Sequence, residues 1–225
     1  RGNLITDCVR INDNHPDGMQ SWSQNGQSVK NMVIEGNAIL EWSNPVVSPK
    51  RCRLQGIGFF DGWYDDITIE NNVISSTAYH GISLYGARRA TVVNNTVVNA
   101  LNEKQSYPWI GIFAHKNGTP STDVTVKNNL AMKMAASSSS TNRNVVRSNS
   151  IIGNPVKVFT DAAAFDYRPK ADSGFIDSGS PDVAPPVDLR NYKRPAGKGP
   201  DRGAYETGSA LLSGSDTTAA MTLTN

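Results

Sequence analysis

Histidine and cysteine are scarce in this chain of 225 residues, which contains 3 His and 2 Cys. Cys8 and Cys52 lack the spacing of metal ligands, which argues against a zinc site. They leave open either one disulfide or two buried thiols. The formal net charge of only +2 excludes a strongly basic nucleic-acid arm or an acidic tail as the main function. No apolar run approaches the ~20 residues of a membrane helix, so we expect neither a nucleic-acid nor a membrane partner.

Helical periodicity is nearly absent, and a short unit of the form apolar–x–Asn–x–apolar recurs instead. The matched asparagines are Asn3, Asn37, Asn72, Asn95, Asn129 and Asn149. Their separations of 34, 35, 23, 34 and 20 residues suit coils of a solenoid, some of which carry a projecting loop. We predict that these asparagines stack as a ladder, each amide bonded to its neighbours above and below.

A second unit, Gly–apolar–x–small or apolar, precedes the Asn units, and alternating strands join the two. Each period therefore contains three short strands, which predicts an all-β fold: a right-handed parallel β-helix of about five to six coils over residues 1–160. Aligning the repeated glycines predicts two inward stacks. One stack would contain Met19, Ile57, Ile82 and Ile112, and the other Ser21, Phe59, Leu84 and Ala114.

The Asn-Asn-x-Val/Ile units and the Gly-Ile-x-Leu strands, from Arg1 to about Phe159, resemble the pectate-lyase-like superfamily of right-handed parallel β-helix proteins. The resemblance implies a bacterial or phage protein that acts on polysaccharides. Residues 161–207 resemble the closing segment of secreted bacterial β-helix proteins, and we expect this segment to cover the end of the solenoid. Residues 208–225 are expected to form a tail or linker.

The resemblance also implies a secreted, cell-surface or phage-particle location. The chain starts in strand-like sequence without Met, so we expect that it begins inside a longer protein or follows processing. A trimer, as in phage tail spikes of similar build, is one possible assembly, and it would place a site between chains.

One outward face of the predicted coil combines aromatic, amide, acidic and imidazole side chains. Its predicted residues are Asp17, Gln20, Trp22, Gln55, Phe60, His80, Tyr85 and His115. Exposed aromatic rings pack against the apolar faces of sugars, and the polar groups bind the hydroxyls. The insertions 40–54 and 99–109 are expected to flank this face. Basic residues gather near it and favour an anionic glycan: Arg53, Arg88, Arg89 and Lys116.

Three functions remain open for this face. A lyase that cleaves a uronate polymer needs a base, an acid and a group that neutralises the carboxylate. The predicted base is His80, or else an arginine or lysine, and the predicted acid is Tyr85, while Gln55, Arg88 or Arg89 would hold the carboxylate. The motif from Asn12 to Gln20 adds His15 and Asp17 as candidates.

No cofactor is certain, although a calcium ion held by Asp13, Asp17 and Asp61 would also neutralise the carboxylate. A glycoside hydrolase would instead pair Asp17 with Asp61. The third function is a non-catalytic glycan-binding or adhesin solenoid. An epimerase is also open as a variant of the first, because it shares the proton abstraction of a lyase.

Overall fold

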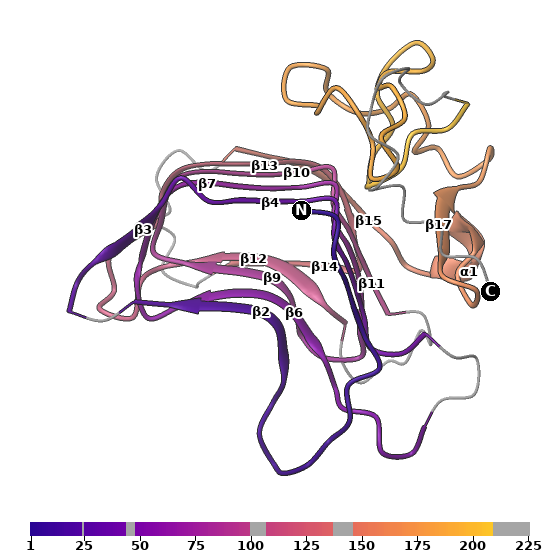
Figure 1. The fold of residues 1–225 in the computed structure, drawn as a ribbon. Coiled ribbons are helices and arrows are strands. Elements are labelled where there is room, and N and C mark those ends of the chain that lie inside the picture. Colours follow the sequence, from indigo (N-terminus) through magenta and orange to yellow (C-terminus); the bar gives the residue numbers. More distant parts are fainter. Residues whose placement is uncertain (24, 44–47, 100–106, 137–145, 209–225) are drawn as a thin grey trace.

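The computed structural model describes residues 1–225 except 24, 44–47, 100–106, 137–145 and 209–225. The predicted tail therefore lies almost entirely outside the described residues. Parallel strands wind into a coil with three walls that enclose an apolar core (Figure 1). Within the described residues, no helix has the length and apolar character needed to cross a membrane.

The first wall, which we call the front wall, is a sheet of five parallel strands in the order β14-β12-β9-β6-β2. These strands are β2 (Asp17–Trp22), β6 (Gln55–Phe60), β9 (His80–Tyr85), β12 (Trp109–Phe113) and β14 (Lys133–Ala136). Because each strand belongs to a different coil, residues that are distant in sequence lie side by side on this wall.

A larger sheet of ten strands bends to form the other two walls. The second wall contains β3 (Ser28–Lys30), β4 (Val33–Glu35), β7 (Trp63–Glu70), β10 (Ala87–Val93) and the first parts of β13 (Thr122–Ala131) and β15 (Val146–Ile151). The third wall contains β1 (Leu4–Thr6), β5 (Ala38–Leu40), β8 (Val73–Ser75), β11 (Thr96–Val98) and the ends of β13 and β15. The predicted right-handed β-helix with three-strand coils is confirmed.

The asparagine ladder is present at the bend between the second and third walls. Asn95 Oδ1 accepts hydrogen bonds from the backbone N–H and Nδ2 of Asn72, at 3.0 and 2.9 Å. The same pattern continues from Asn3 through Asn37 to Asn129 and Asn149. Every amide in the buried part of the ladder is thus satisfied, which allows polar side chains to sit inside the coil.

The residue before most of the ladder asparagines adopts a left-handed backbone. Gly36, Asn71, Asn94 and Asn128 have φ between 52 and 64°. Glycine and asparagine tolerate this conformation better than other residues. The doubled asparagine therefore combines a turn-forming residue with a ladder residue, which explains why the pair recurs.

The front-wall register corrects one sequence-based alignment. Ile82 of β9 pairs with Ile110 of β12, and Leu84 pairs with Ile112. The fourth members of the two inward stacks are therefore Ile110 and Ile112, so the predicted members Ile112 and Ala114 are wrong by two residues. Gly111 matches Ser83 and Gly58 in register rather than the repeated glycine Gly81. A slip of two residues preserves the alternation of inward and outward side chains, so the sequence pattern did not reveal it.

The C-terminal segment contains α1 (Pro155–Val158), β16 (Phe159–Asp161), β17 (Asp166–Pro169) and a long irregular stretch. It lies along the side of the coil, next to β11 and β15, and not over its end (Figure 1). The Tyr167 hydroxyl donates to Ser75 Oγ of β8 at 2.7 Å, and the Ala204 N–H donates to Thr96 Oγ1 of β11 at 3.0 Å. The predicted end cover is therefore wrong.

The physical reason for this placement is that the third wall is apolar on both faces. Ile39 and Ile74 face the coil interior, whereas Leu40 and Val73 belong to a second apolar cluster with Phe159 and Tyr167. A strand that is apolar on both faces needs a second layer to bury its outer side. The C-terminal segment supplies that layer.

Candidate functional site

Five aromatic side chains form a closed ring on the outer surface of β6, β9 and β12. We call this group the aromatic platform, and its members are Phe60, His80, Tyr85, Phe113 and Trp109. Successive ring centroids lie 5.3 Å (Phe60–His80), 5.2 Å (His80–Trp109), 6.2 Å (Trp109–Phe113), 4.6 Å (Phe113–Tyr85) and 5.5 Å (Tyr85–Phe60) apart. All five rings are half-buried, so the platform offers a partly exposed apolar surface.

Small residues under the rings make this arrangement possible. A Cβ added to Gly58 would lie 2.3 Å from the Phe60 ring, and one added to Gly111 would lie 2.4 Å from the Phe113 ring. Ser83, which lies between these glycines in register, is fully buried and accepts a hydrogen bond from Trp109 Nε1 at 2.9 Å. The small residues Gly58, Ser83 and Gly111, which lie side by side on three neighbouring strands, therefore let the rings lie flat against the sheet.

His80 is held in one orientation at the edge of the platform. Its Nδ1 lies 2.8 Å from Gln55 Oε1, which can only accept a hydrogen bond, so Nδ1 carries the proton of the neutral ring. Burial, together with the nearby His15, lowers the pKa of His80 to about 4. At neutral pH the imidazole is thus uncharged, and its Nε2 lone pair can accept a proton.

Asp17 is the first residue of β2, and it pairs in register with Gln55, the first residue of the neighbouring strand β6. Its side chain is 6% exposed, and Oδ2 lies 3.6 Å from Nδ1 of the exposed His15. Burial raises the pKa of Asp17, although the proximity of His15 opposes this shift. The other oxygen, Oδ1, is buried without a hydrogen-bond partner among the described residues. Two imidazoles, one carboxyl group and one amide therefore meet at the start of β2, β6 and β9.

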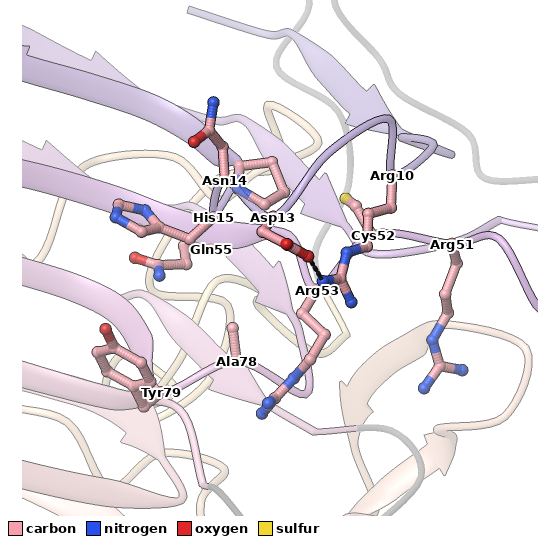
Figure 2. A pocket seen from close by; sticks show the side chains of 11 residues that line it. Arg10, Asp13, Asn14, His15, Arg51, Cys52, Arg53, Gln55, Ala78 and Tyr79 are labelled. Carbon is pink, nitrogen blue, oxygen red and sulfur yellow. Dashed lines mark hydrogen bonds and ion pairs between the residues drawn. The ribbon is translucent and has the colours of Figure 1, made fainter.

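Beside these groups lies a pocket of about 230 Å³, which we call the arginine pocket. His15, Gln55 and Tyr79 lie on one side of it, and Arg10, Arg51 and Arg53 on the other (Figure 2). The Tyr79 ring centroid is 4.3 Å from that of His80 and 5.1 Å from that of Trp109. The arginine pocket is thus continuous with the aromatic platform.

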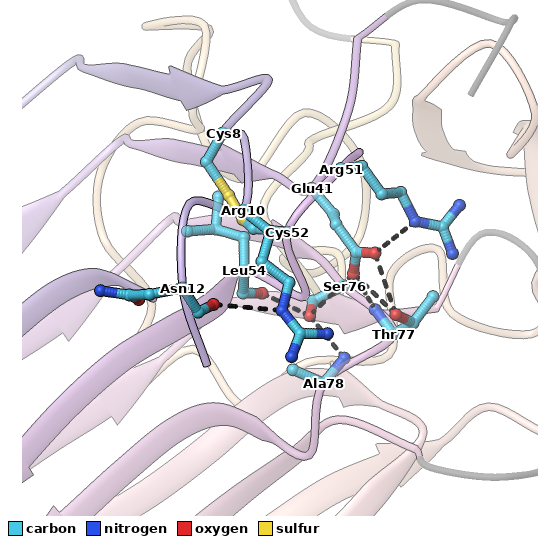
Figure 3. Close-up of a disulfide and its surroundings, with 10 residues drawn as sticks. All are labelled: Cys8, Arg10, Asn12, Glu41, Arg51, Cys52, Leu54, Ser76, Thr77 and Ala78. Carbon is cyan, nitrogen blue, oxygen red and sulfur yellow. Dashed lines mark hydrogen bonds and ion pairs between the residues drawn. A yellow bond between two sulfur atoms is a disulfide. The ribbon is translucent and has the colours of Figure 1, made fainter. Parts of the chain in front are cut away.

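A buried network fixes Arg51 in this pocket (Figure 3). Its Nε lies 2.8 Å from Oε1 of Glu41, a fully buried carboxylate that also accepts hydrogen bonds from the backbone N–H and hydroxyl of Thr77. The Arg51 guanidinium also packs over the Trp42 ring, at 4.8 Å from the centroid. Its position is therefore largely set before any ligand arrives.

A disulfide between Cys8 and Cys52 connects the two segments that form this pocket (Figure 3). The Cα atoms are 5.5 Å apart, and the Cys52 N–H donates to the Cys8 carbonyl at 3.0 Å. Arg10 follows Cys8, while Arg51 and Arg53 flank Cys52. Of the two possibilities left open by the sequence, the bridge is the one present, and it joins the two basic segments.

At the opposite end of the front wall lies a second pocket, lined by Trp22, Asp61, His115 and Lys116 among others. These predicted binding residues are therefore brought together, but away from His80. Register matches Phe113 to Tyr85, so Phe113 and not His115 completes the row of Trp22, Phe60 and Tyr85. Gln20 is exposed on the edge strand β2, where it pairs with Gly58.

The predicted roles of Arg88 and Arg89 do not fit the positions of these residues. Arg88 lies on β10 in the second wall and forms a bidentate ion pair with Asp65, at 2.6 and 2.9 Å. Arg89 forms a similar pair with Asp66, at 2.8 and 2.9 Å. The predictions that Arg88 and Arg89 act on the front wall are wrong, because both residues lie on β10 in the second wall.

The predicted hydrolase pair is also wrong. Asp17 pairs with the first residue of β6, whereas Asp61 follows the last one, so the two carboxyls lie about 20 Å apart along the strand direction. Glycosidases place such carboxyls roughly 5–9.5 Å apart.

The predicted calcium site does not form either. Within the described part of the chain, no three acidic, histidine or cysteine side chains gather in a way that could hold a metal ion. Asp13 instead pairs with Arg10, and Asp61 with Lys116.

Five residues of the site are not among the predicted site residues: Tyr79, Trp109, Phe113, Arg10 and Arg51. Arg51 and Trp109 fall within the two insertions that the sequence predicts to flank the face. Trp109 had been placed in an insertion, although it pairs with His80 in register. The sequence pattern also predicts that Phe113 faces outward, but aligning the glycines assigns it to the row of Ser83, whereas it pairs with Tyr85. Two predicted flanking insertions, 40–54 and 99–109, include residues 44–47 and 100–106, which lie outside the described residues.

Comparison with known families agrees with this architecture. Residues 1–167 match the family described as a right-handed beta helix region. The chain belongs to this family. No curated protein and no solved structure gives a significant match to this β-helix chain. The match ends within β17, so it includes the first part of the segment that covers the third wall. Membership is compatible with a glycan-acting protein, and the choice of reaction depends on the front wall.

Proposed function

We propose that this β-helix protein binds an acidic polysaccharide on its front wall and cleaves it by β-elimination. The observation that supports this proposal best is the state of His80. It is a neutral imidazole of the aromatic platform, oriented by Gln55, and Gln55 also lines the pocket that contains three arginines. This combination provides a base beside cationic groups, as elimination next to a carboxylate requires.

In the proposed reaction, His80 Nε2 removes the proton from the sugar carbon next to the carboxylate. The electron pair forms a carbon–carbon double bond as the glycosidic C–O bond breaks at the adjacent carbon. Arginines of the pocket pair with the substrate carboxylate and stabilise the charge that develops on it. The departing oxygen receives a proton from a tyrosine hydroxyl, so no external oxidant or water is needed.

Two tyrosines are candidates for this acid. Burial raises the pKa of Tyr85, which keeps its hydroxyl protonated, but the Phe60 ring lies between Tyr85 and His80. Tyr79 is directly adjacent to His80. Because the proton acceptor and donor act on neighbouring carbons, the geometry favours Tyr79 as the acid and Tyr85 as a platform residue. Tyr79→Phe and Tyr85→Phe variants separate the two assignments.

A non-catalytic glycan-binding role is the second candidate, and the aromatic platform favours it. Half-buried rings that lie flat against the sheet suit the apolar faces of sugars whether or not a bond is cleaved. A hydrolase has less support, because the two carboxyls predicted for it, those of Asp17 and Asp61, lie about 20 Å apart. The Cys8–Cys52 disulfide supports an extracellular or cell-surface setting, since such bridges persist in oxidising compartments.

The proposal is tested by incubating the protein with pectate, alginate and other uronate polymers while following the ultraviolet absorbance of the unsaturated product. We expect absorbance to rise with the wild-type protein and to stay flat with His80→Asn. Asparagine can still donate a hydrogen bond to Gln55 but has no basic lone pair, so this variant should keep its fold and its glycan affinity. Full turnover by His80→Asn would remove His80 from the mechanism. Binding without product would favour the second candidate.

A further inference from the structure

The pocket at the far end of the front wall has the composition of a second sugar subsite. It has a volume of about 380 Å³, and it lies where β2 and β6 end. The arginine pocket lies where the same strands begin. Since β6 is six residues long, the two pockets are about 20 Å apart, with the aromatic platform between them.

Trp22 provides an exposed ring at this end. Its side chain is 59% exposed, although tryptophan normally buries most of its area, and it pairs in register with Phe60 of the platform. It belongs to β2, which is the edge strand of the front wall. An indole in this position can stack against a sugar ring and continue the surface that Phe60 and Tyr85 begin.

His115 forms a rigid side of the same pocket. Its ring stacks on Trp63 with a centroid distance of 4.3 Å and an interplanar angle of 7°. The Arg88 guanidinium packs over that indole, 4.7 Å from the centroid, and is itself fixed by Asp65. This stack of planar groups holds His115 in one orientation before a ligand binds. The entropic cost of binding is lower because the side chain is already ordered.

Lys116 and Asp61 supply polar groups of both signs. Their charged atoms are 3.4 Å apart, and both side chains are largely exposed. Such a pair contributes little stability, so its atoms can exchange partners at low cost. An ammonium donates to hydroxyl or carboxylate oxygens and a carboxylate accepts from hydroxyl protons, so the pair can bind the polar groups of a sugar residue.

We propose that this pocket is a second subsite of the same glycan-binding face, where a sugar residue stacks on Trp22 and hydrogen-bonds to Asp61 and Lys116. The polymer then lies along the strands, from the arginine pocket across the aromatic platform to Trp22, and not along the axis of the coil. This inference rests on the proposed glycan-binding function but not on cleavage. The ligand of this face is then a long acidic glycan, of which several consecutive sugar residues are bound at once.

The test measures affinity as a function of oligomer length. Calorimetry with oligogalacturonates and oligomannuronates of two to eight residues is carried out on the wild type, on Trp22→Ala and on Ile151→Ala. Ile151 is similarly exposed, at 55%, but lies on β15 away from this face. We expect Trp22→Ala to weaken binding of the longest oligomers at least tenfold and to leave the shortest unchanged. Ile151→Ala should bind all lengths as the wild type does.

The outcomes distinguish this inference from the cleavage proposal. An equal loss for all lengths, or no loss for any, would overturn the second subsite while leaving cleavage by His80 intact. A length-dependent loss without any turnover by the wild type would support the subsite and refute the lyase. If the wild type bound none of these oligomers, both proposals would fail. Lys116→Gln provides an independent check, since it should also weaken only the long oligomers.

Discussion

His80 and Gln55 are joined across neighbouring coils by one hydrogen bond of 2.8 Å, between Nδ1 and Oε1. The bond fixes the tautomer of a histidine that burial keeps uncharged. The proposed chemistry therefore depends on an amide that need not touch the substrate.

Gln55→Glu should raise the pKa of His80 above its value of about 4, because a carboxylate stabilises the imidazolium. NMR titration of the His80 ring protons measures this change directly. Gln20→Glu is the matched control, since Gln20 is an exposed glutamine of the same wall in register with Gly58. An unchanged His80 titration in Gln55→Glu would show that the hydrogen bond does not control the protonation state.

Stability should fall as the pH drops from about 6.5 towards 4. Over this range the unfolded chain protonates its histidine at the ordinary pKa, whereas folded His80 stays neutral, so protons favour the unfolded state. Asp17 acts in the opposite direction, because its raised pKa makes the folded state bind the extra proton above the ordinary carboxyl pKa. Thermal unfolding of the wild type and of His80→Asn across this range isolates the histidine contribution. The variant should show a shallower decline, and an equally steep one would contradict the assignment.

Removal of the Cys8–Cys52 bridge should lower the free energy of unfolding by roughly 4 kcal/mol, given the 44-residue separation of the two cysteines. The Cys8→Ser/Cys52→Ser protein should also bind acidic oligomers more weakly, because Arg10 loses its tether to the segment of Arg51 and Arg53. Denaturant unfolding and calorimetry measure the two effects. Unchanged affinity in a folded double variant would show that the arginine pocket does not need the bridge.

Asn95→Ala should destabilise the coil by at least ~2 kcal/mol. The Asn95 side chain is fully buried, accepts two hydrogen bonds from Asn72 and donates to the carbonyls of Ile69 and Val93 and to Asn129. Its loss leaves several buried groups unpaired, at about 1–3 kcal/mol each before relaxation. Asn117→Ala, at an exposed turn, should have little effect in the same denaturant titration. Equal stability of the two variants would contradict the importance of the ladder.

The ladder and most of the inward residues could be predicted from the sequence because each coil repeats the same local requirement. Ile57 and Ile82 must face inward to bury a strand, and Asn72 must satisfy its own turn, whatever the coils are used for. The association of Asp17, Gln55 and His80 followed from the same reasoning.

What could not be predicted depends on register and on contacts between distant segments. β12 has no glycine at the position of Gly81, so aligning the glycines shifts the strand by two residues and places Phe113 out of register with Tyr85. Arg88 and Arg89 were assigned to the front wall because the sequence does not reveal that Asp65 and Asp66 lie opposite them on the next coil.

The position of the C-terminal segment has a consequence for how this protein can change in length. The segment bonds to the turn asparagine of three successive coils, with Val187 at Asn71, Asp201 at Asn94 and Ser180 at Asn128. Solenoids commonly grow by duplication of a coil, since each coil needs only its neighbours. Here an inserted coil would shift every later asparagine by one strand spacing, about 4.8 Å, away from its partner. The spacing of these contacts along the segment therefore limits how many coils this part of the protein can contain.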